Sequence, residues 1–527
     1  MKGNPLQTIP DLLHRYVVPA APPMAWSAAP TRRRSRVGLA ALAGILLVQG
    51  LLSLRLMNTA YQDEALYLYA GHMYLDLWFG DGAKPPQGFL DIFSGAPYLY
   101  PVAAALVDSV FGLAGARFVS LLCMAGVTAL IYSLTVRLFN VRAALAAAAA
   151  YAVIEATTYM GNFATFDAPA LLFITVAFWL VVRFDRRPSW PLMIIVPFLL
   201  SLAFAVKYAA AMFAGPVVAL AVVVAWPYRG AVRSLLRGVG LFAMTGVFIG
   251  LWVAFGGFLQ GLRFTTIDRE INTDASAAWV LRLAAEYGGV FLLMALLGGV
   301  LYLRSQRLNE VPLAQRGPEG AVSPGKVWRF FLAAGLFSSG LLVPAYQAYI
   351  HTQVALHKHL GFGLMFAAPL VGVGLVRLMG RHFSSPQFAI AAWLLLLVPG
   401  MQQSEKLFYG WPDSTMLMKL VDAELEPDDL YLSSVPQVQQ YYLGDRTTLE
   451  QWVSTYDLLD PFLQEKYLKY VEQTRFDMIM LDDQVEPEVN KKIQDTVEAN
   501  PKYRLRARFY YGQGELFGNY MIWVKLP

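Results

Sequence analysis

The chain has 527 residues, of which 57% are hydrophobic and 15% are charged, and its formal net charge is +5. Soluble globular chains carry about 25% charged residues, so this composition excludes an ordinary soluble protein and makes lipid the solvent for most of the chain. The basic residues stand in short clusters between apolar segments, where membrane topology accounts for them better than nucleic-acid binding does. The single cysteine, Cys123, excludes an intrachain disulfide and a thiolate metal cluster.

The apolar segments predict a polytopic α-helical membrane domain with about eleven spanning helices over residues 37–402. The arginine clusters between these segments fall consistently on the cytoplasmic side if the N-terminal segment, residues 1–36, is cytoplasmic. An odd number of spans then places the C-terminal region outside the membrane. The longest predicted outer loop, 58–114, contains an apolar stretch, Pro97–Leu113, which predicts a helix at the membrane surface or partly inside it.

Composition changes after about Gln402, where acidic residues and lysines return and the apolar runs become shorter. Residues 403–527 therefore predict a small extracytoplasmic α/β domain. Its expected elements are buried strands at Asp429–Ser433 and Phe476–Leu481, a helix at Glu486–Ala499, and paired strands at Tyr503–Tyr511 and Tyr520–Leu526.

An acidic pair, Asp63 and Glu64, follows the first predicted span by a few residues and is flanked by Tyr61 and Tyr67. A carboxylate that is partly desolvated at a membrane surface gains proton affinity and can act as a general base toward a hydroxyl. A solvated acidic pair at the end of a helix is the structural alternative.

Asp167 opens the fourth predicted span, on the same predicted membrane face as Asp63 and Glu64. With Pro169 two residues later, Asp167 is suited to be a helix N-cap. Its position also suits a catalytic role, and a capping aspartate can hold a catalytic partner, so the sequence leaves both interpretations open.

Three cations, Lys207, Arg263 and Arg269, stand on the predicted outer face, against the positive-inside trend. Long basic side chains near a membrane interface can extend to water without any function. The functional alternative is that these residues bind the phosphate of a lipid-linked substrate, for which a guanidinium offers bidentate contact.

A further predicted outer loop contains His357, Lys358 and His359. The spacing of the two histidines is poor for a zinc pair, so we interpret this loop as a substrate-contacting segment and not as a metal site. The carboxylates of the acidic pair and of Asp167 offer oxygen ligands for a divalent cation, and a reaction without metal is equally compatible with them.

Taken in order, these motifs resemble those of the C-type membrane glycosyltransferases, which take sugars from polyprenyl phosphates, and especially the protein O-mannosyltransferases and the aminoarabinose transferase of lipid A. The resemblance covers the first six predicted spans. The matching segments are the acidic pair in Asp63–Tyr67, a G-x-R-x-x-S helix start in Gly115–Ser120, a turn similar to R-L-F-G-x-R in Arg137–Arg142, Asp167–Pro169, and the lysine in Ala205–Tyr208.

One family element is displaced in this chain. The family often has K-P-P before the interfacial helix, and Lys84-Pro85-Pro86 is present, but Gly95-Ala96-Pro97 stands directly before that helix. Lys84 is therefore a candidate phosphate ligand whose register differs from the family pattern.

The resemblance implies an inverting transfer of a hexose or pentose at the outer face of a plasma membrane. Asp63 would deprotonate or orient the acceptor hydroxyl, while Lys207 and Arg263 would stabilise the departing phosphate. The implied partners are a polyprenyl-phosphate sugar donor, an acceptor in a glycan, lipid or protein of the cell envelope, and membrane lipid, with no nucleic acid. No cofactor is required, and the sequence has no nucleotide-binding G-x-x-x-x-G-K-[ST] loop.

Two other classes of protein compete with this interpretation. A multi-pass transporter or flippase would use buried charges such as Glu155 and Asp108 to line a path, whereas the best candidates here gather on one predicted membrane face. A non-catalytic assembly protein would use the C-terminal domain as its binding module.

Overall fold

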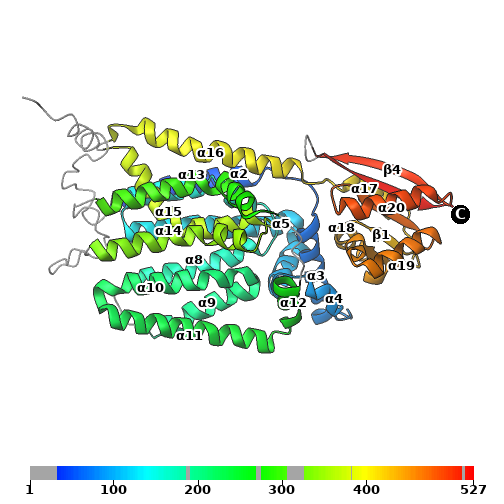
Figure 1. Cartoon of the computed structure of the whole chain (residues 1–527), viewed down its shortest axis with the longest axis horizontal. Coiled ribbons are helices and arrows are strands. Elements are labelled where there is room, and N and C mark those ends of the chain that lie inside the picture. The colour runs from blue at the N-terminus through cyan, green and yellow to red at the C-terminus, as the bar shows by residue number, and fades with distance from the viewer. Residues whose placement is uncertain (1–31, 185–189, 269–274, 305–325, 381–382, 513–516) are drawn as a thin grey trace, which may run out of the picture. The chain divides into compact units, whose positions relative to one another are not determined.

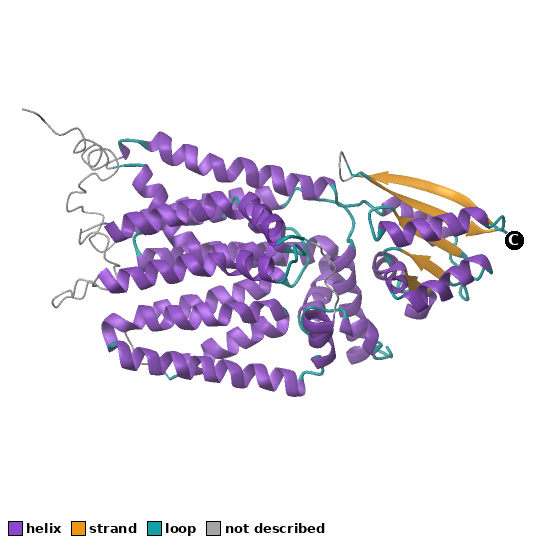
Figure 2. Cartoon of the chain, in the orientation of Figure 1, coloured by secondary structure: helices purple, strands orange, loops and turns teal. Residues whose placement is uncertain are grey.

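The computed structural model describes residues 32–184, 190–268, 275–304, 326–380, 383–512 and 517–527. These residues form two compact units, which we call the helical unit and the sheet unit (Figure 1). The helical unit contains the chain up to Leu54, Gln87–Ala96 and Arg117–Ser404, and the sheet unit contains Arg55–Pro86, Pro97–Ala116 and Glu405–Pro527. Figure 2 shows that the strands occur in the C-terminal part of the chain and that the rest is helical.

Seven helical segments of the described chain are long and apolar enough to cross a membrane. The protein is therefore a multi-pass α-helical membrane protein, as the composition predicted. These segments lie in α2 (Arg32–Ser53), α5 (Tyr100–Leu138), the 3₁₀ helix η2 (Tyr208–Phe213) together with α10 (Ala214–Arg229), α11 (Ala231–Phe255), α13 (Ala277–Arg304), α14 (Lys326–Tyr349) and α15 (Leu356–Leu378).

The remaining predicted spans correspond to α6, α8, α9 and α16, which fall outside those seven segments. Short helices complete the helical unit. The bounds of these elements are α4 (Gln87–Asp91), α6 (Val141–Tyr151), α7 (Glu155–Met160), α8 (Asp167–Arg183), α9 (Leu192–Val206), α12 (Leu259–Arg263), the π-helical turn η3 (Phe264–Asp268) and α16 (Pro386–Tyr409).

Helix α5 is interrupted at Gly112, which has a φ of +65° that other residues rarely adopt. The segment before this glycine is therefore a separate helix from the span that follows it. This break agrees with the boundary predicted for the helix over Pro97–Leu113.

Helix α15 is buried along most of its length and packs against α13, α14 and α6 (Figure 1). At Gly372 the approach to α6 is so close that an added Cβ would lie 2.0 Å from the carbonyl oxygen of Ala143. Small residues at helix crossings are the usual means of close packing in membranes. The first turn of α15, which carries His357, Lys358 and His359, is thus attached to a tightly packed helix.

Gly372→Ala is expected to lower the melting temperature of the detergent-solubilised protein, because its Cβ would overlap the Ala143 carbonyl. Overpacking of this kind costs about 1–3 kcal/mol. Gly250→Ala in α11 is the matched control, since an added Cβ there meets no atom within 4 Å. Thermal unfolding of the two variants side by side makes the comparison, and equal melting temperatures would contradict the packing described here.

The sheet unit contains a five-stranded sheet in the order β2-β1-β3-β5-β4. The first three strands in this order are parallel, and β5 is antiparallel to both β3 and β4. The strands are β1 (Tyr431–Ser433), β2 (Trp452–Ser454), β3 (Met478–Asp482), β4 (Tyr503–Tyr511) and β5 (Gly518–Lys525).

The predicted α/β character of this region is confirmed, including the β4–β5 pair and the helix at α20 (Pro487–Ala499). The sequence did not predict β2. It also did not predict α17 (Thr415–Ala423), α18 (Pro436–Leu443), the 3₁₀ turns η7 (Leu449–Gln451) and η8 (Thr455–Leu459), or α19 (Pro461–Glu472).

The sheet unit also includes α3 (Gln62–Phe79), whose first turn carries the acidic pair. Ala60, Tyr61 and Ala65 belong to the same buried cluster as Tyr431 and Ile522 of the sheet. The start of α3 is therefore part of the hydrophobic core of the sheet unit.

Candidate active site

Asp167 is the first residue of α8 and is completely buried. Its Oδ2 accepts a hydrogen bond of 3.2 Å from the Thr165 hydroxyl. The N-cap residue of α8 is Phe166, and no side chain caps this helix. The capping interpretation of Asp167 is therefore excluded, and its carboxylate faces cations instead.

Two lysines from different parts of the helical unit contact this carboxylate. The Lys207 Nζ lies 2.7 Å from Asp167 Oδ1, and the Lys358 Nζ lies 3.4 Å from Oδ2. The two lysines are only 3% and 8% exposed, and the Lys207 ammonium also lies 4.6 Å from the centre of the Phe166 ring. Two ammonium groups and one carboxylate give this buried trio a formal charge of +1, an arrangement that favours an additional anion.

The backbone of Lys207 is fixed where α9 ends. Lys207 is extended, with φ −148° and ψ 116°, between α9 and η2. Two backbone hydrogen bonds brace this break: the amide of Ala96 donates to the Ala205 carbonyl at 2.7 Å, and the amide of Tyr208 donates to the Ser94 carbonyl at 2.8 Å. At Gly95, between these two contacts, an added Cβ would lie 2.0 Å from the Val206 carbonyl oxygen, so only glycine fits without displacement.

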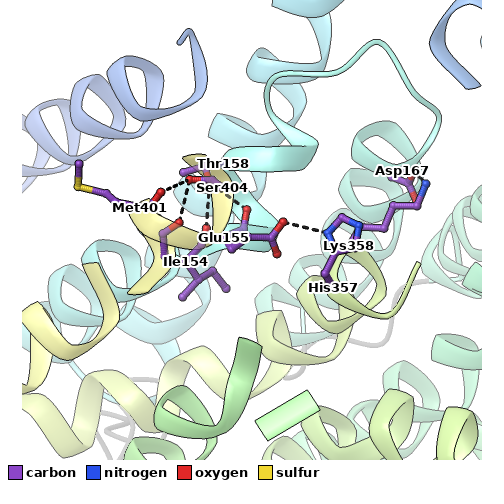
Figure 3. Close-up of polar contacts among 9 residues, drawn as sticks. Ile154, Glu155, Thr158, Asp167, His357, Lys358, Met401 and Ser404 are labelled. Atoms are coloured by element: carbon purple, nitrogen blue, oxygen red, sulfur yellow. Dashed lines mark hydrogen bonds and ion pairs between the residues drawn. The ribbon is translucent and has the colours of Figure 1, made fainter. Parts of the chain in front are cut away.

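Glu155, the first residue of α7, is 1% exposed and lies beside the predicted substrate loop. Its Oε1 is 2.9 Å from the His357 Nδ1 (Figure 3). The His357 ring also packs against Tyr159 and Tyr287, with centroid distances of 4.6 and 5.9 Å. Figure 3 shows Glu155 facing His357 while Lys358 extends toward Asp167, so consecutive residues of α15 pair with two different carboxylates.

The sequence had assigned Glu155 only to a transport path, and its pairing with His357 was missed. The available signal was an acidic residue inside the apolar stretch 143–156. His359 is half-buried, and its Nδ1 lies 3.5 Å from the Gln347 Nε2. His357, Lys358 and His359, which were predicted to lie in a loop, lie in the first turn of α15. The structure thus brings this turn together with Asp167 and Lys207 in the helical unit.

The other predicted site residues lie elsewhere. Arg263 is exposed at the end of α12, and no hydrogen bond or ion pair joins it to the Asp167 trio in the part of the chain that the structure describes. Arg269 lies outside the described residues. Lys84 is exposed in the sheet unit, on the chain after α3.

The acidic pair also belongs to the sheet unit, in the first turn of α3. Asp63 is exposed, whereas Glu64 is completely buried. A single catalytic site that combines the pair with Asp167 stays a prediction. Among the described residues, no group of three or more His, Cys, Asp and Glu side chains is arranged to hold a metal ion, and a requirement for a divalent cation also stays a prediction.

Comparison with solved structures defines the class of fold. The chain is similar to the archaeal oligosaccharyltransferase AglB from Archaeoglobus fulgidus, solved in complex with an inhibitory peptide and a dolichol-phosphate. The two sequences are 12% identical, the alignment covers 93% of this chain and 74% of that chain, and the TM-score is 0.51. For the apo form of the same organism's oligosaccharyltransferase the identity is 12%, the coverage is 93% and 75%, and the TM-score is 0.50. ArnT from Cupriavidus metallidurans bound to undecaprenyl phosphate is 14% identical over 93% of this chain and 97% of that chain, with a TM-score of 0.45.

A family model described as dolichyl-phosphate-mannose-protein mannosyltransferase matches residues 95–253. This range contains Gly95, Asp167 and Lys207. No curated protein matches the chain. The fold is thus that of a C-type membrane glycosyltransferase, and the resemblance predicted from the motifs is confirmed at that level.

Gly95→Ala is expected to displace the backbone on either side of Lys207 and so to weaken the contact of its ammonium with Asp167. The change should reduce any activity that depends on Lys207 by about tenfold or more, because small misplacements of a charged group cost that much. Gly215→Ala in α10 serves as the control, since an added Cβ there meets no atom within 4 Å. The measurement is the transfer rate at matched folded concentration, and full activity in Gly95→Ala would contradict this role for the glycine.

Proposed function

We propose that this protein is a membrane glycosyltransferase that moves a hexose or pentose from a polyprenyl-phosphate donor to an acceptor hydroxyl, with inversion at the anomeric carbon. The observation that carries the proposal is the Asp167 carboxylate held between two buried ammonium groups. The matching family model is named for a dolichyl-phosphate-mannose donor, and AglB was solved with a dolichol-phosphate. These names support a lipid-phosphate donor for this chain.

The charge of the lysine pair suits the leaving group of such a donor. When the bond between the anomeric carbon and the phosphate oxygen breaks, the electron pair leaves with the phosphate and increases its negative charge. Fixed ammonium groups in a site with little water stabilise that charge strongly and need no reorganisation. Lys207 and Lys358 would bind the phosphate, and Asp167 would keep the two lysines together against their mutual repulsion.

The nucleophile is the acceptor hydroxyl. Asp63 would take its proton as the oxygen attacks the anomeric carbon on the face opposite the phosphate, which inverts that centre. The products are the glycosylated acceptor and polyprenyl phosphate, and the proton resides on the Asp63 carboxyl. Glu64 would assist Asp63, while His357, His359, Arg263, Arg269 and Lys84 are proposed substrate contacts.

The proposed orientation follows the arginine clusters, with the N-terminus cytoplasmic and residues 403–527 outside a plasma membrane. The acceptor would then be a glycan, lipid or protein of the cell envelope. Glu155 and Asp108, which a transporter would use along its path, are each paired with a histidine, at 2.9 and 2.7 Å. The family model and the oligosaccharyltransferase neighbour, both named for transferases, favour the transferase over the transporter or flippase.

Lys207→Met and Lys358→Met are each expected to reduce stabilisation of the protein by a short-chain polyprenyl phosphate. A ligand at 100 times its Kd stabilises the folded state by about 2.7 kcal/mol, and loss of a charge-assisted contact weakens binding by about 1.5–3 kcal/mol. Melting temperature as a function of lipid-phosphate concentration provides the measurement. Lys326→Met, which removes an exposed lysine at the start of α14, is the matched control and should respond like wild type; identical responses of all four proteins would contradict the phosphate site.

Asp63→Asn is expected to abolish transfer while it leaves the binding of polyprenyl phosphate unchanged, because the amide cannot accept the proton of the acceptor hydroxyl. General-base catalysis contributes about 10²–10⁴-fold, which sets the size of the loss. The assay incubates purified protein with radiolabelled polyprenyl-phosphate sugars and a cell-envelope fraction, with and without a divalent cation. No transfer by wild type from any common donor, combined with movement of a lipid or solute in liposomes, would instead establish the transporter.

A further inference from the structure

The segment that enters α3 is built into the core of the sheet unit. Tyr61 is 5% exposed, and its ring makes an edge-to-face contact with Trp411 at a centroid distance of 5.5 Å. The backbone around it is also held, because the Asn58 amide group donates to the Trp411 carbonyl at 2.7 Å and the Ser414 amide donates to the Thr59 hydroxyl at 2.8 Å. Two residues after Tyr61, the acidic pair begins.

The hydroxyl of Tyr61 donates to Oδ2 of Asp482 at 2.8 Å. Asp482 is the last residue of β3, is 1% exposed, and also accepts from the Tyr511 hydroxyl and from the Gln484 amide. Burial, together with the Asp482 charge, raises the pKa of Tyr61 well above its ordinary value, so this phenol remains a hydrogen-bond donor. A strand near the C-terminus thereby fixes a residue from the first predicted outer loop.

The backbone between this anchor and the acidic pair is strained. Gln62 has a φ of +40°, in the left-handed region that non-glycine residues rarely occupy. Such a conformation persists only where the surroundings determine it, and residues held this way cluster at functional sites. The Tyr61 anchor on one side and α3 on the other supply those constraints.

A second anchor holds α3 farther along. His72 Nε2 lies 2.7 Å from Asp108 Oδ2, and the Tyr441 hydroxyl donates to Asp108 Oδ1 at 2.9 Å. The next residue of α18, Tyr442, accepts a hydrogen bond of 2.8 Å from the Ala60 amide. Helix α18 therefore contacts both the segment before α3 and the third turn of α3.

We propose that Asp482 is a positioning residue, which through Tyr61 fixes the first turn of α3 and so the direction of the Asp63 carboxylate. The sheet domain is then the part of the enzyme that aligns the general base. This inference rests on the proposed function for its catalytic consequence, whereas its structural part, the immobilisation of α3, does not.

The test compares wild type with Tyr61→Phe, Asp482→Asn and Tyr503→Phe in the full-length protein. Tyr503→Phe is the matched control, because its hydroxyl donates to the Phe476 carbonyl at 2.7 Å, and both residues belong to a different buried cluster of the sheet unit from Tyr61. The first measurement is the rate of hydrogen–deuterium exchange in the peptide that covers the first turns of α3. This rate is expected to rise by roughly fivefold in Tyr61→Phe and Asp482→Asn, because loss of one net hydrogen bond changes an equilibrium by about that factor. It should stay unchanged in Tyr503→Phe.

In the transfer assay, kcat should fall by about tenfold or more in Tyr61→Phe and Asp482→Asn while KM for the lipid donor stays at the wild-type value, since the base is misaligned and the phosphate site is intact. Unchanged exchange in these two variants, or increased exchange with unchanged kcat, would overturn the proposal. An equal response of Tyr503→Phe would also overturn it, because general loosening of the sheet would then be the cause. If wild type transfers no sugar, the proposed function fails, and the exchange comparison still decides whether Asp482 immobilises α3.

Discussion

The pairing of one buried aspartate with two buried lysines is the constraint on which the helical unit depends. Removing these charges from water costs several kcal/mol for each ion unless their partners are placed well, so α8, α9 and α15 must end or begin at one point. Asp167 is the first residue of α8, Lys207 follows α9, and Lys358 lies in the first turn of α15. The ends of three helices therefore place two ammonium groups and one carboxylate together, with an excess of one positive charge.

Two of the candidate site residues, Lys207 and Asp63, lie beside irregular backbone at the end or the start of a helix, and packed helices support these positions. Lys207 occupies an extended break that Gly95 allows, and Asp63 follows the left-handed Gln62. Close packing through Gly372 holds the remote part of α15 in place. A break in a helix exposes side chains and backbone in directions that a regular helix cannot offer, and rigid neighbours keep that break from relaxing.

Local patterns predicted the seven apolar spans and the β4–β5 pair, and they marked Asp167 and Lys207 as site candidates, because hydropathy and short motifs depend on a few neighbouring residues. The side chains that these residues contact could not be predicted from local patterns. Neither the approach of Lys358 to Asp167 nor the bond from Tyr61 to Asp482 has any local signature, since the packing of distant segments creates both. The role of Asp167 was ambiguous for the same reason, because capping is a local pattern and pairing with lysine is not.

The two acidic residues in the first turn of α3 differ in burial. Asp63 is exposed and can meet an acceptor that arrives from water, whereas Glu64 has no accessible surface and cannot reach an acceptor unless α3 moves. A general base must lie within hydrogen-bonding distance of the proton it removes, so for the proposed transfer Asp63, and not Glu64, is the candidate base. The position of the Asp63 carboxylate depends on the backbone of the first turn of α3, and the segment that enters this turn is held by hydrogen bonds to Asp482 and Tyr442 of the sheet unit.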